Sequence, residues 1–245
     1  MIFGLVLLPE SKNSQSARID LVSAALSVLA IVPVVYAIKH AISQGVDWSV
    51  LAGILISAIS GWIFVRRQQR LPEPLVDISL FRIPAFSGAV AANGIAIFAF
   101  FGVLFFLSQY LQLVKGYSPF WAGLAEMPAM LASIAVIAIV GTLLSKLGLG
   151  RAIATGLLLG AAGLTGLALT EGLPSFLWMG ISLGVVGLGI GIAMTLSTDA
   201  VVSAAPPARA GAASSIAETA YELGVALGIA VLGSIQTAVY RAHLQ

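Results

Sequence analysis

Long apolar runs separated by short polar gaps dominate this chain. A hydrocarbon core about 30 Å thick requires roughly 20 apolar residues in a helix. Seven runs approach or exceed that length, at 21–38, 49–65, 86–110, 120–144, 152–170, 174–198 and 211–238. They lack the alternation and the short length of barrel strands. The pattern therefore predicts an all-α, polytopic membrane protein with seven transmembrane helices.

Two polar or truncated segments predict the domain organisation. Residues 1–8 form an apolar stub that is too short to span and lacks the features of a signal peptide, so we interpret it as the truncated end of a preceding transmembrane helix. The longest polar stretch, 66–85, contains three prolines and separates two groups of spans. We expect an extra central helix pair within 9–65 and a bundle of five spans within 86–245.

The charged residues indicate the orientation. Only 9% of the residues are charged, against about a quarter in soluble domains. If gap 9–20 is cytoplasmic, the cytoplasmic gaps hold nine basic residues, Lys12, Arg18, Arg66, Arg67, Arg70, Arg82, Lys146, Arg151 and Arg209. The outer gaps hold three, Lys39, Lys115 and Arg241. The positive-inside rule then predicts a cytoplasmic 66–85 loop and an outer 40–48 loop, and it explains the basic excess without a nucleic-acid partner.

Several kinds of chemistry are excluded or unsupported. The chain has no cysteine, and its two histidines, His40 and His243, lie at span ends. No phosphate-binding loop or dinucleotide motif occurs in the required context. Gly180–Gly184 fits the G-x-S-x-G pattern, but it lies inside an apolar helix rather than at a strand–turn–helix elbow. We expect neither an enzyme nor a cofactor or metal site.

Acidic residues within the spans are the main functional candidates, because each costs at least ~2.5 kcal/mol on insertion scales. Glu218 and Glu222 lie one helical turn apart and share a face, with Gly224 and Gly228 roughly opposite. We expect the glycines to pack on a neighbouring helix and the acids to face a cavity. Glu222 lies about 11 residues, or roughly 17 Å, inside its span, near the membrane midplane. Gly156/Gly160 and Gly187/Gly191 are further small-residue pairs that predict tight helix packing.

Each acid leaves two interpretations open. Burial favours the neutral form of a carboxyl group, so Glu222, and Glu218 to a lesser degree, could couple proton movement to alternating access. Alternatively, both are structural and hydrogen-bonded. Glu126, shortly before Pro128, is either a recognition group for cationic substrates or a satisfied polar contact. For Asp199 we expect pairing or capping around the 203–210 loop.

A polar and aromatic stripe occupies the third run. Its members recur at helical spacing and are Phe98, Phe101, Phe105, Gln109 and Gln112. If the stripe faces a cavity, it offers aromatic faces to organic cations. If it faces lipid, the phenylalanines are ordinary. Asn93 in the same run predicts an interhelical hydrogen bond.

Four stretches carry a family resemblance, at 17–41, 74–93, 107–124 and 198–235. The most specific is TDAVVSAAPPARAGAASSIAETAYELGVALGIAVLGSI at 198–235. Together they resemble the second half of the fourteen-span drug:proton antiporters of the EmrB/QacA type in the major facilitator superfamily. The resemblance implies an incomplete major facilitator fold containing spans seven to thirteen, without the first half and the last span.

The resemblance extends weakly to a cytoplasmic signature in GTLLSKLGLGR. The residues that match it are Gly141, Lys146, Gly148 and Arg151, whereas Ser145 replaces the usual aspartate. The positive-inside rule explains the two basic residues equally well.

The resemblance also implies a function. It predicts a multi-pass protein of a bacterial plasma membrane that exports hydrophobic compounds or organic cations in exchange for protons, as a fragment of a larger transporter. Its partners would be the lipid bilayer, protons, the exported compounds and the missing N-terminal half. The sequence leaves open the alternative of a non-transporting membrane remnant or an assembly partner for other transporters.

Overall fold

The computed structural model describes residues 20–72, 74–170, 172–173, 175–206 and 209–243. The helices are α2 (Leu21–Gln44), α3 (Trp48–Gln68), η1 (a 3-10 helix, Ile78–Arg82), α4 (Pro84–Leu113), α5 (Pro119–Leu147), α6 (Leu149–Thr170), α7 (Phe176–Ala204) and α8 (Ala210–His243). Seven of these described helices are long and apolar enough to cross a membrane. The predicted all-α class is confirmed, and the described residues contain no strand. The predicted stub at 1–8 lies outside them.

Every described span is longer than its apolar run, because polar residues next to the run belong to the helix. The side chains of Asp20 and Asp47 accept hydrogen bonds from the backbone of Ser23 and Val50, and so begin α2 and α3. At its other end α3 continues through Arg66 and Arg67 to Gln68, beyond the predicted end at residue 65. A hydropathy window detects only the apolar middle of such a helix.

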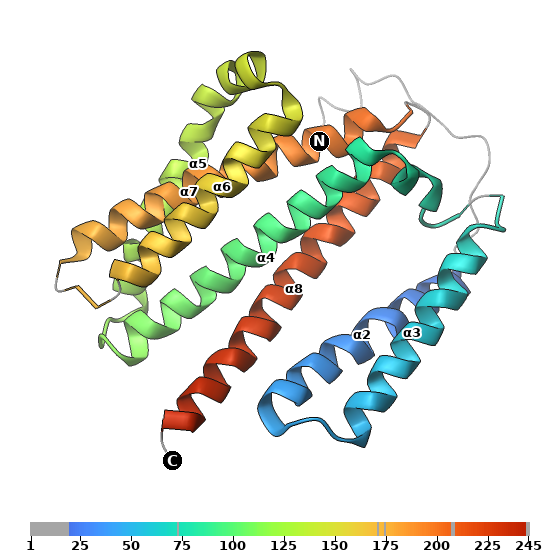
Figure 1. Ribbon diagram of the computed structural model, residues 1–245, viewed down its shortest axis with the longest axis horizontal. Helices are drawn as coiled ribbons and strands as arrows, with labels where there is room; N and C mark the ends of the chain where they lie inside the picture. The colour runs from blue at the N-terminus through green and yellow to red at the C-terminus, as the bar shows by residue number, and fades with distance from the viewer. Residues whose placement is uncertain (1–19, 73, 171, 174, 207–208, 244–245) are drawn as a thin grey trace, which may run out of the picture.

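Two central helices organise the bundle. α4 packs against α8 on one side and α7 on the other, while α5 and α6 pack on α7. α2 and α3 pack mainly on each other, and α2 also contacts α8. Figure 1 shows this order, with α5, α6 and α7 on one side of α4, α8 beside α4, and the α2–α3 pair beyond α8.

Glycines allow the helix backbones of the bundle to approach closely. A Cβ atom on Gly189 of α7 would collide with the backbone nitrogen of Gly160 on α6. One on Gly187 would collide with the carbonyl of Ala129 on α5. Backbone approach through small residues is the usual means of packing helices in lipid, so the predicted role of these glycine pairs is confirmed.

The 66–85 segment is folded onto the helices rather than extended into solvent. Leu80 of η1 and Phe86 at the start of α4 are almost fully buried, and the ring of Phe81 meets Phe86 edge-on. The side-chain amide of Gln68 donates to Ser23 Oγ and accepts from the backbone N–H of Val76. The segment is therefore attached to both α2 and α4.

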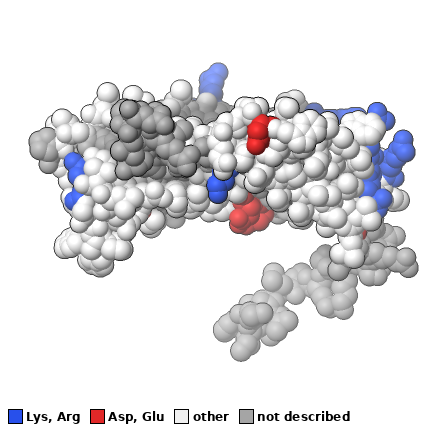
Figure 2. All heavy atoms as spheres, turned by 90° about the horizontal axis from the view of Figure 1, so that it is seen from below, with Lys and Arg blue, Asp and Glu red and all other residues white. Residues whose placement is uncertain are grey.

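The surface charge matches the span assignment. Figure 2 shows Lys and Arg gathered mainly at the end of the molecule where α3 finishes, while the rest of the visible face is mostly uncharged with isolated basic and acidic patches. Large apolar side chains such as Trp62, Ile137 and Leu158 are exposed on the helix faces. Exposed apolar side chains of this kind are suited to contact with lipid.

Candidate functional site

The two acids of α8 lie on its uncovered face. Gly224 and Gly228 face α4. A Cβ on Gly224 would approach the carbonyl oxygen of Gly94, and one on Gly228 would approach that of Phe98. This confirms the predicted glycine packing. Glu218 and Glu222 are exposed, and neither forms an ion pair with any described residue. The helix thus presents both carboxylates away from the packed seam.

The α4–α8 seam also locates Glu222 in depth. Gly224, two residues from Glu222, lies against Ile97. Ile97 is near the middle of the 30-residue helix α4. Glu222 is therefore close to the centre of the span, as its sequence position predicts, and Glu218 lies about one turn nearer the start of α8.

Glu126 is in a different environment. It lies on α5 among Ala122, Ala125 and Ala129, which are buried, and its own side chain is partly buried. Its Oε1 atom is buried and has no hydrogen-bond partner in the described structure. An unsatisfied buried carboxylate oxygen is costly. This oxygen therefore does not make the satisfied polar contact that was one of the two interpretations of Glu126. It can bind a proton, or accept a hydrogen bond from a water or a cationic ligand.

The predicted stripe on α4 follows the seam with α8. Phe101 meets Tyr221 of α8 edge-on, with the ring centroids 5.8 Å apart. The side chain of Gln112 donates to Ser108 Oγ, and Phe105 is 39% exposed. The contact with Tyr221 brings the stripe next to the segment that carries Glu222. Phe98 and Gln109 are partly buried.

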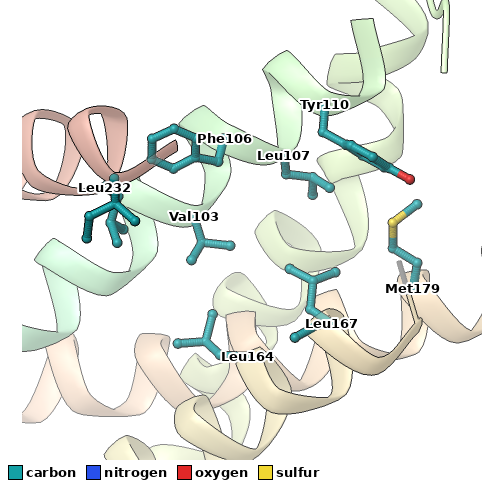
Figure 3. Close-up of a pocket in the computed structure, with 10 residues that line it drawn as sticks. Val103, Phe106, Leu107, Tyr110, Leu164, Leu167, Met179 and Leu232 are labelled. Atoms are coloured by element: carbon teal, nitrogen blue, oxygen red, sulfur yellow. The ribbon is translucent and has the colours of Figure 1, made fainter. Parts of the chain in front are cut away.

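A separate apolar cavity of about 400 Å³ lies between α4, α6, α7 and α8 (Figure 3). Its α4 side consists of Val103, Phe106, Leu107 and Tyr110, which occupy one helix face at i, i+3, i+4 and i+7. This face is not the one that carries the predicted stripe. Among the side chains labelled in Figure 3, only Tyr110 and Met179 contribute a heteroatom. Sequence reasoning missed the cavity because α4 is apolar on most of its circumference.

Two buried polar atoms lie on the central helices. Asn93 Oδ1 on α4 and Ser197 Oγ on α7 are buried and have no partner in the described structure. The predicted interhelical hydrogen bond of Asn93 is therefore not made through this oxygen. Ser197 was not singled out from the sequence, because a serine within an apolar run is usually hydrogen-bonded to its own helix.

The signature-like loop forms the turn between α5 and α6. Gly148 ends α5 with φ 75° and donates its N–H to the carbonyl of Leu144, so the turn itself explains this glycine. A Cβ on Gly141 would meet no atom within 4 Å. Lys146 and Arg151 are exposed and form no ion pair with a described residue.

Polar contacts at the ends of the helices were not predicted. Arg67 pairs with Asp20 at 3.1 Å, and Ser23 donates to the same carboxylate. The hydrogen bonds from Ser23, followed by those from Arg67, lower the pKa of Asp20 to about 2.

Arg209 pairs with Asp77 at 2.6 Å, 132 positions away in the chain, whereas Asp199 has no ion pair in the described structure. The expected pairing around the 203–210 loop is thus made by Asp77 instead.

Together, seven long apolar helices packed through glycines around α4 and α7 are the architecture of a polytopic α-helical membrane protein. Residues 21–229 match the model of the Major Facilitator Superfamily, and the chain belongs to that family.

Curated relatives are similar over the whole chain. The chain is 38% identical to the multidrug efflux pump LfrA of Mycolicibacterium smegmatis over 245 residues, which are 100% of this chain and 48% of LfrA. It is 32% identical to the multidrug resistance protein Stp of Mycobacterium tuberculosis over 100% of this chain and 46% of Stp. It is 31% identical to the methyl viologen resistance protein SmvA of Salmonella typhimurium over 100% of this chain and 50% of SmvA. The chain therefore spans about half the length of these relatives.

Proposed function

We propose that the chain is the second half of a fourteen-span, proton-coupled exporter of hydrophobic compounds and organic cations in a bacterial plasma membrane. The names of the relatives support export of drugs, and methyl viologen is an organic dication. The observation that carries the proton-coupled part is the position of Glu218 and Glu222 on the uncovered face of α8, opposite its packed glycines.

In this proposal the uncovered face of α8 lines a cavity whose other wall comes from the other half of the transporter. Substrate sites in such folds lie near the midplane between two repeat halves. Glu222 takes up a proton when the cavity opens outward and releases it when the cavity opens to the cytoplasm. A proton moving inward across 100 mV supplies roughly 2.3 kcal/mol, which can drive export. Glu218, nearer the interface, assists this exchange.

The aromatic stripe and Glu126 are the proposed substrate groups. Phe101 and Tyr221 offer ring faces and edges beside the acid-bearing segment of α8. Glu126 offers an oxygen that has no donor in the described structure. An organic cation bound beside this oxygen would place a positive charge next to the carboxylate. We therefore assign cation selectivity to Glu126 and proton coupling to the α8 pair.

The test is drug efflux by the complete natural gene product in inverted membrane vesicles, with proton flux followed by a pH-sensitive dye. Glu222→Gln keeps the shape and hydrogen-bonding capacity but removes the titratable proton, so we expect proton-coupled efflux to be abolished at normal expression. Glu218→Gln is the matched control on the same face and should retain partial activity. Glu126→Gln should change which cations are exported more than the coupling. Normal transport by Glu222→Gln would show that this carboxyl group is structural.

A second experiment separates a half-transporter from a complete one. The 245-residue chain in proteoliposomes should show no substrate-dependent proton flux, because alternating access requires two bundles moving about one site. Flux comparable to that of the natural gene product would contradict the requirement for the other half.

A further inference from the structure

Two buried polar side chains lie on the central helices α4 and α7. Asn93 is 3% exposed and Ser197 is 0% exposed. Neither Asn93 Oδ1 nor Ser197 Oγ has a hydrogen-bond partner among the described residues. Such atoms are uncommon in proteins, because a buried polar atom that makes no bond has lost its bonds to solvent without compensation. The two oxygens therefore require an explanation.

Ser197 differs from the other two buried serines of the described bundle. Ser182 on α7 donates to the carbonyl of Trp178 at 3.0 Å, and Ser234 on α8 donates to that of Ala230 at 2.7 Å. A bond to its own helix is the usual way in which a serine inside an apolar helix is satisfied. Ser197 Oγ makes no such bond. Its hydroxyl is therefore available to a group outside its own helix.

Asn93 and Ser197 lie on the faces by which α4 and α7 meet. Buried clusters join the two helices at three levels, Leu107 and Leu111 with Met179 and Leu183, Ala96 with Ile190 and Ala193, and Ala89 and Ala92 with Leu196 and Ala200. The order reverses between the helices, so they are antiparallel. Asn93 is three positions before Ala96, and Ser197 is four positions after Ala193. Both spacings keep a residue on the same helix face, so Asn93 and Ser197 lie at the same depth in one contact.

The buried cluster at this depth is otherwise apolar. It joins α4, α7 and α8 and includes Ala92, Leu196 and Ala217. Within it, Asn93 and Ser197 are the polar side chains available to one another. Their oxygens make no direct bond, and a water molecule joins polar groups that are too far apart for one. A buried water typically makes about three hydrogen bonds, and it both donates and accepts, which suits an amide carbonyl facing a hydroxyl.

We propose that one buried water molecule joins Asn93 to Ser197 and so links the two central helices of the bundle. The water donates to Asn93 Oδ1 and accepts from the hydroxyl of Ser197. Both orphan oxygens are then satisfied through a single ligand. A bond through water adapts to small changes in helix spacing more readily than a direct bond between two short side chains, so α4 and α7 stay linked when their spacing changes.

Contact between water and Asn93 can be measured directly. The chain has only one other asparagine, Asn13, so the Asn13→Gln variant of the 245-residue chain carries a single asparagine. Asparagine labelled with carbon-13 at the side-chain carbonyl then reports Asn93 alone. Solid-state NMR in lipid bilayers measures the transfer of magnetisation from water protons to this carbon. We expect clear transfer although the side chain is buried, and no transfer would overturn the proposal.

Matched serine variants test the second partner of the water. Ser197→Ala removes that partner, so the transfer to Asn93 should fall severalfold. Ser182→Ala removes a buried serine of the same helix that bonds to its own backbone, so it should leave the transfer unchanged. Equal transfer in the Ser197→Ala variant and the parent would overturn the link to Ser197.

Thermal unfolding in detergent provides an independent check. If Asn93 and Ser197 share one water, the combined variant Asn93→Ala with Ser197→Ala should lower the unfolding temperature by less than the sum of the two single changes. Asn93→Ala combined with Ser182→Ala should be additive. Additive losses for Asn93 and Ser197 would overturn the shared site. These measurements involve no transport, so they test the water site separately from the proposed export.

Discussion

The α2–α3 pair and the bundle of five helices from α4 to α8 are both strongly apolar, but α7 at the centre of the bundle is far more buried than either helix of the pair. Half of the hydrophobic window of α7 is buried, against 11% of that of α2, although α2 has the higher mean hydropathy. Trp48 and Trp62 of α3 are 80% and 61% exposed. Burial inside a membrane therefore does not follow hydrophobicity, because lipid is as apolar as a packed neighbour. It follows the availability of small residues that let backbones approach.

The contacts between helices show the same difference. In the bundle, glycines on α7 meet the backbones of both α5 and α6. In the pair, Gly53 of α3 lies against Pro33 and Ala37 of α2, and Ser57 donates to the carbonyl of Ala30. The two helices of the pair pack closely along one seam, and α2 also contacts α8, so their remaining faces are available to lipid or to other helices.

The largest expected effect concerns the two ends of the pair, which we predict to lie on opposite sides of the membrane. Val46→Cys and Gln69→Cys, each as the only cysteine, mark exposed positions on either side of α3. An impermeant thiol reagent added to intact cells should label position 46 and not position 69, as the distribution of basic residues requires. Labelling of position 69 alone would reverse the orientation of both regions.

The next effect tests the glycine seam of the bundle. Gly189→Ala puts a methyl group against the Gly160 backbone and should destabilise the chain by about 1–3 kcal/mol, as overpacking does. Gly53→Ala should cost less, because the nearest atom to its Cβ, Pro33 O, would be 2.9 Å away, which is a milder overlap than the one at Gly189. Thermal unfolding in detergent by circular dichroism measures both. Gly184→Ala is the control, since nothing lies within 4 Å. Equal losses at positions 184 and 189 would refute the seam argument.

A smaller effect is expected where the segment after the pair joins the bundle. Arg209→Ala and Asp77→Ala each remove one member of a partly exposed ion pair. A double-mutant cycle on unfolding should give a coupling of about 0.2–1 kcal/mol, the range for such pairs. A coupling energy of zero would show that the segment is held by Leu80 and Gln68 alone.

The smallest effect is a pH dependence of stability at the start of α2. Since hydrogen bonds from Ser23 and Arg67 lower the pKa of Asp20 from 3.8 to about 2, the carboxylate stabilises the fold above its unfolded pKa. That contribution is lost as the pH falls from about 4 toward 2. Asp20→Asn should therefore lower the unfolding temperature at neutral pH, and its difference from the parent chain should disappear in acid. Asp199→Asn, which removes an exposed acid without an ion pair in the described structure, should show a smaller difference at neutral pH.

The candidate groups were predicted unevenly. Glu218, Glu222 and Glu126 could be selected from the sequence because a charge inside an apolar run is rare whatever the fold. The apolar cavity could not, because Val103 and Phe106 look like any other residues of an apolar helix. Nor could the pairing of Arg209 with Asp77, which depends on where two distant loops meet.

The sequence by itself determined the seven spans and the all-helical class, because membrane partition is a local property of about 20 consecutive side chains. The sequence pattern also placed Gly224 and Gly228 opposite Glu218 and Glu222, since helical periodicity sets which residues share a face. Only the tertiary structure decided which helix each face meets, which oxygens stay unpaired, and that the 66–85 segment folds onto α2, α4 and α8. A helix that is apolar on all sides carries no signal for its neighbours, so these contacts arise only from packing the whole set.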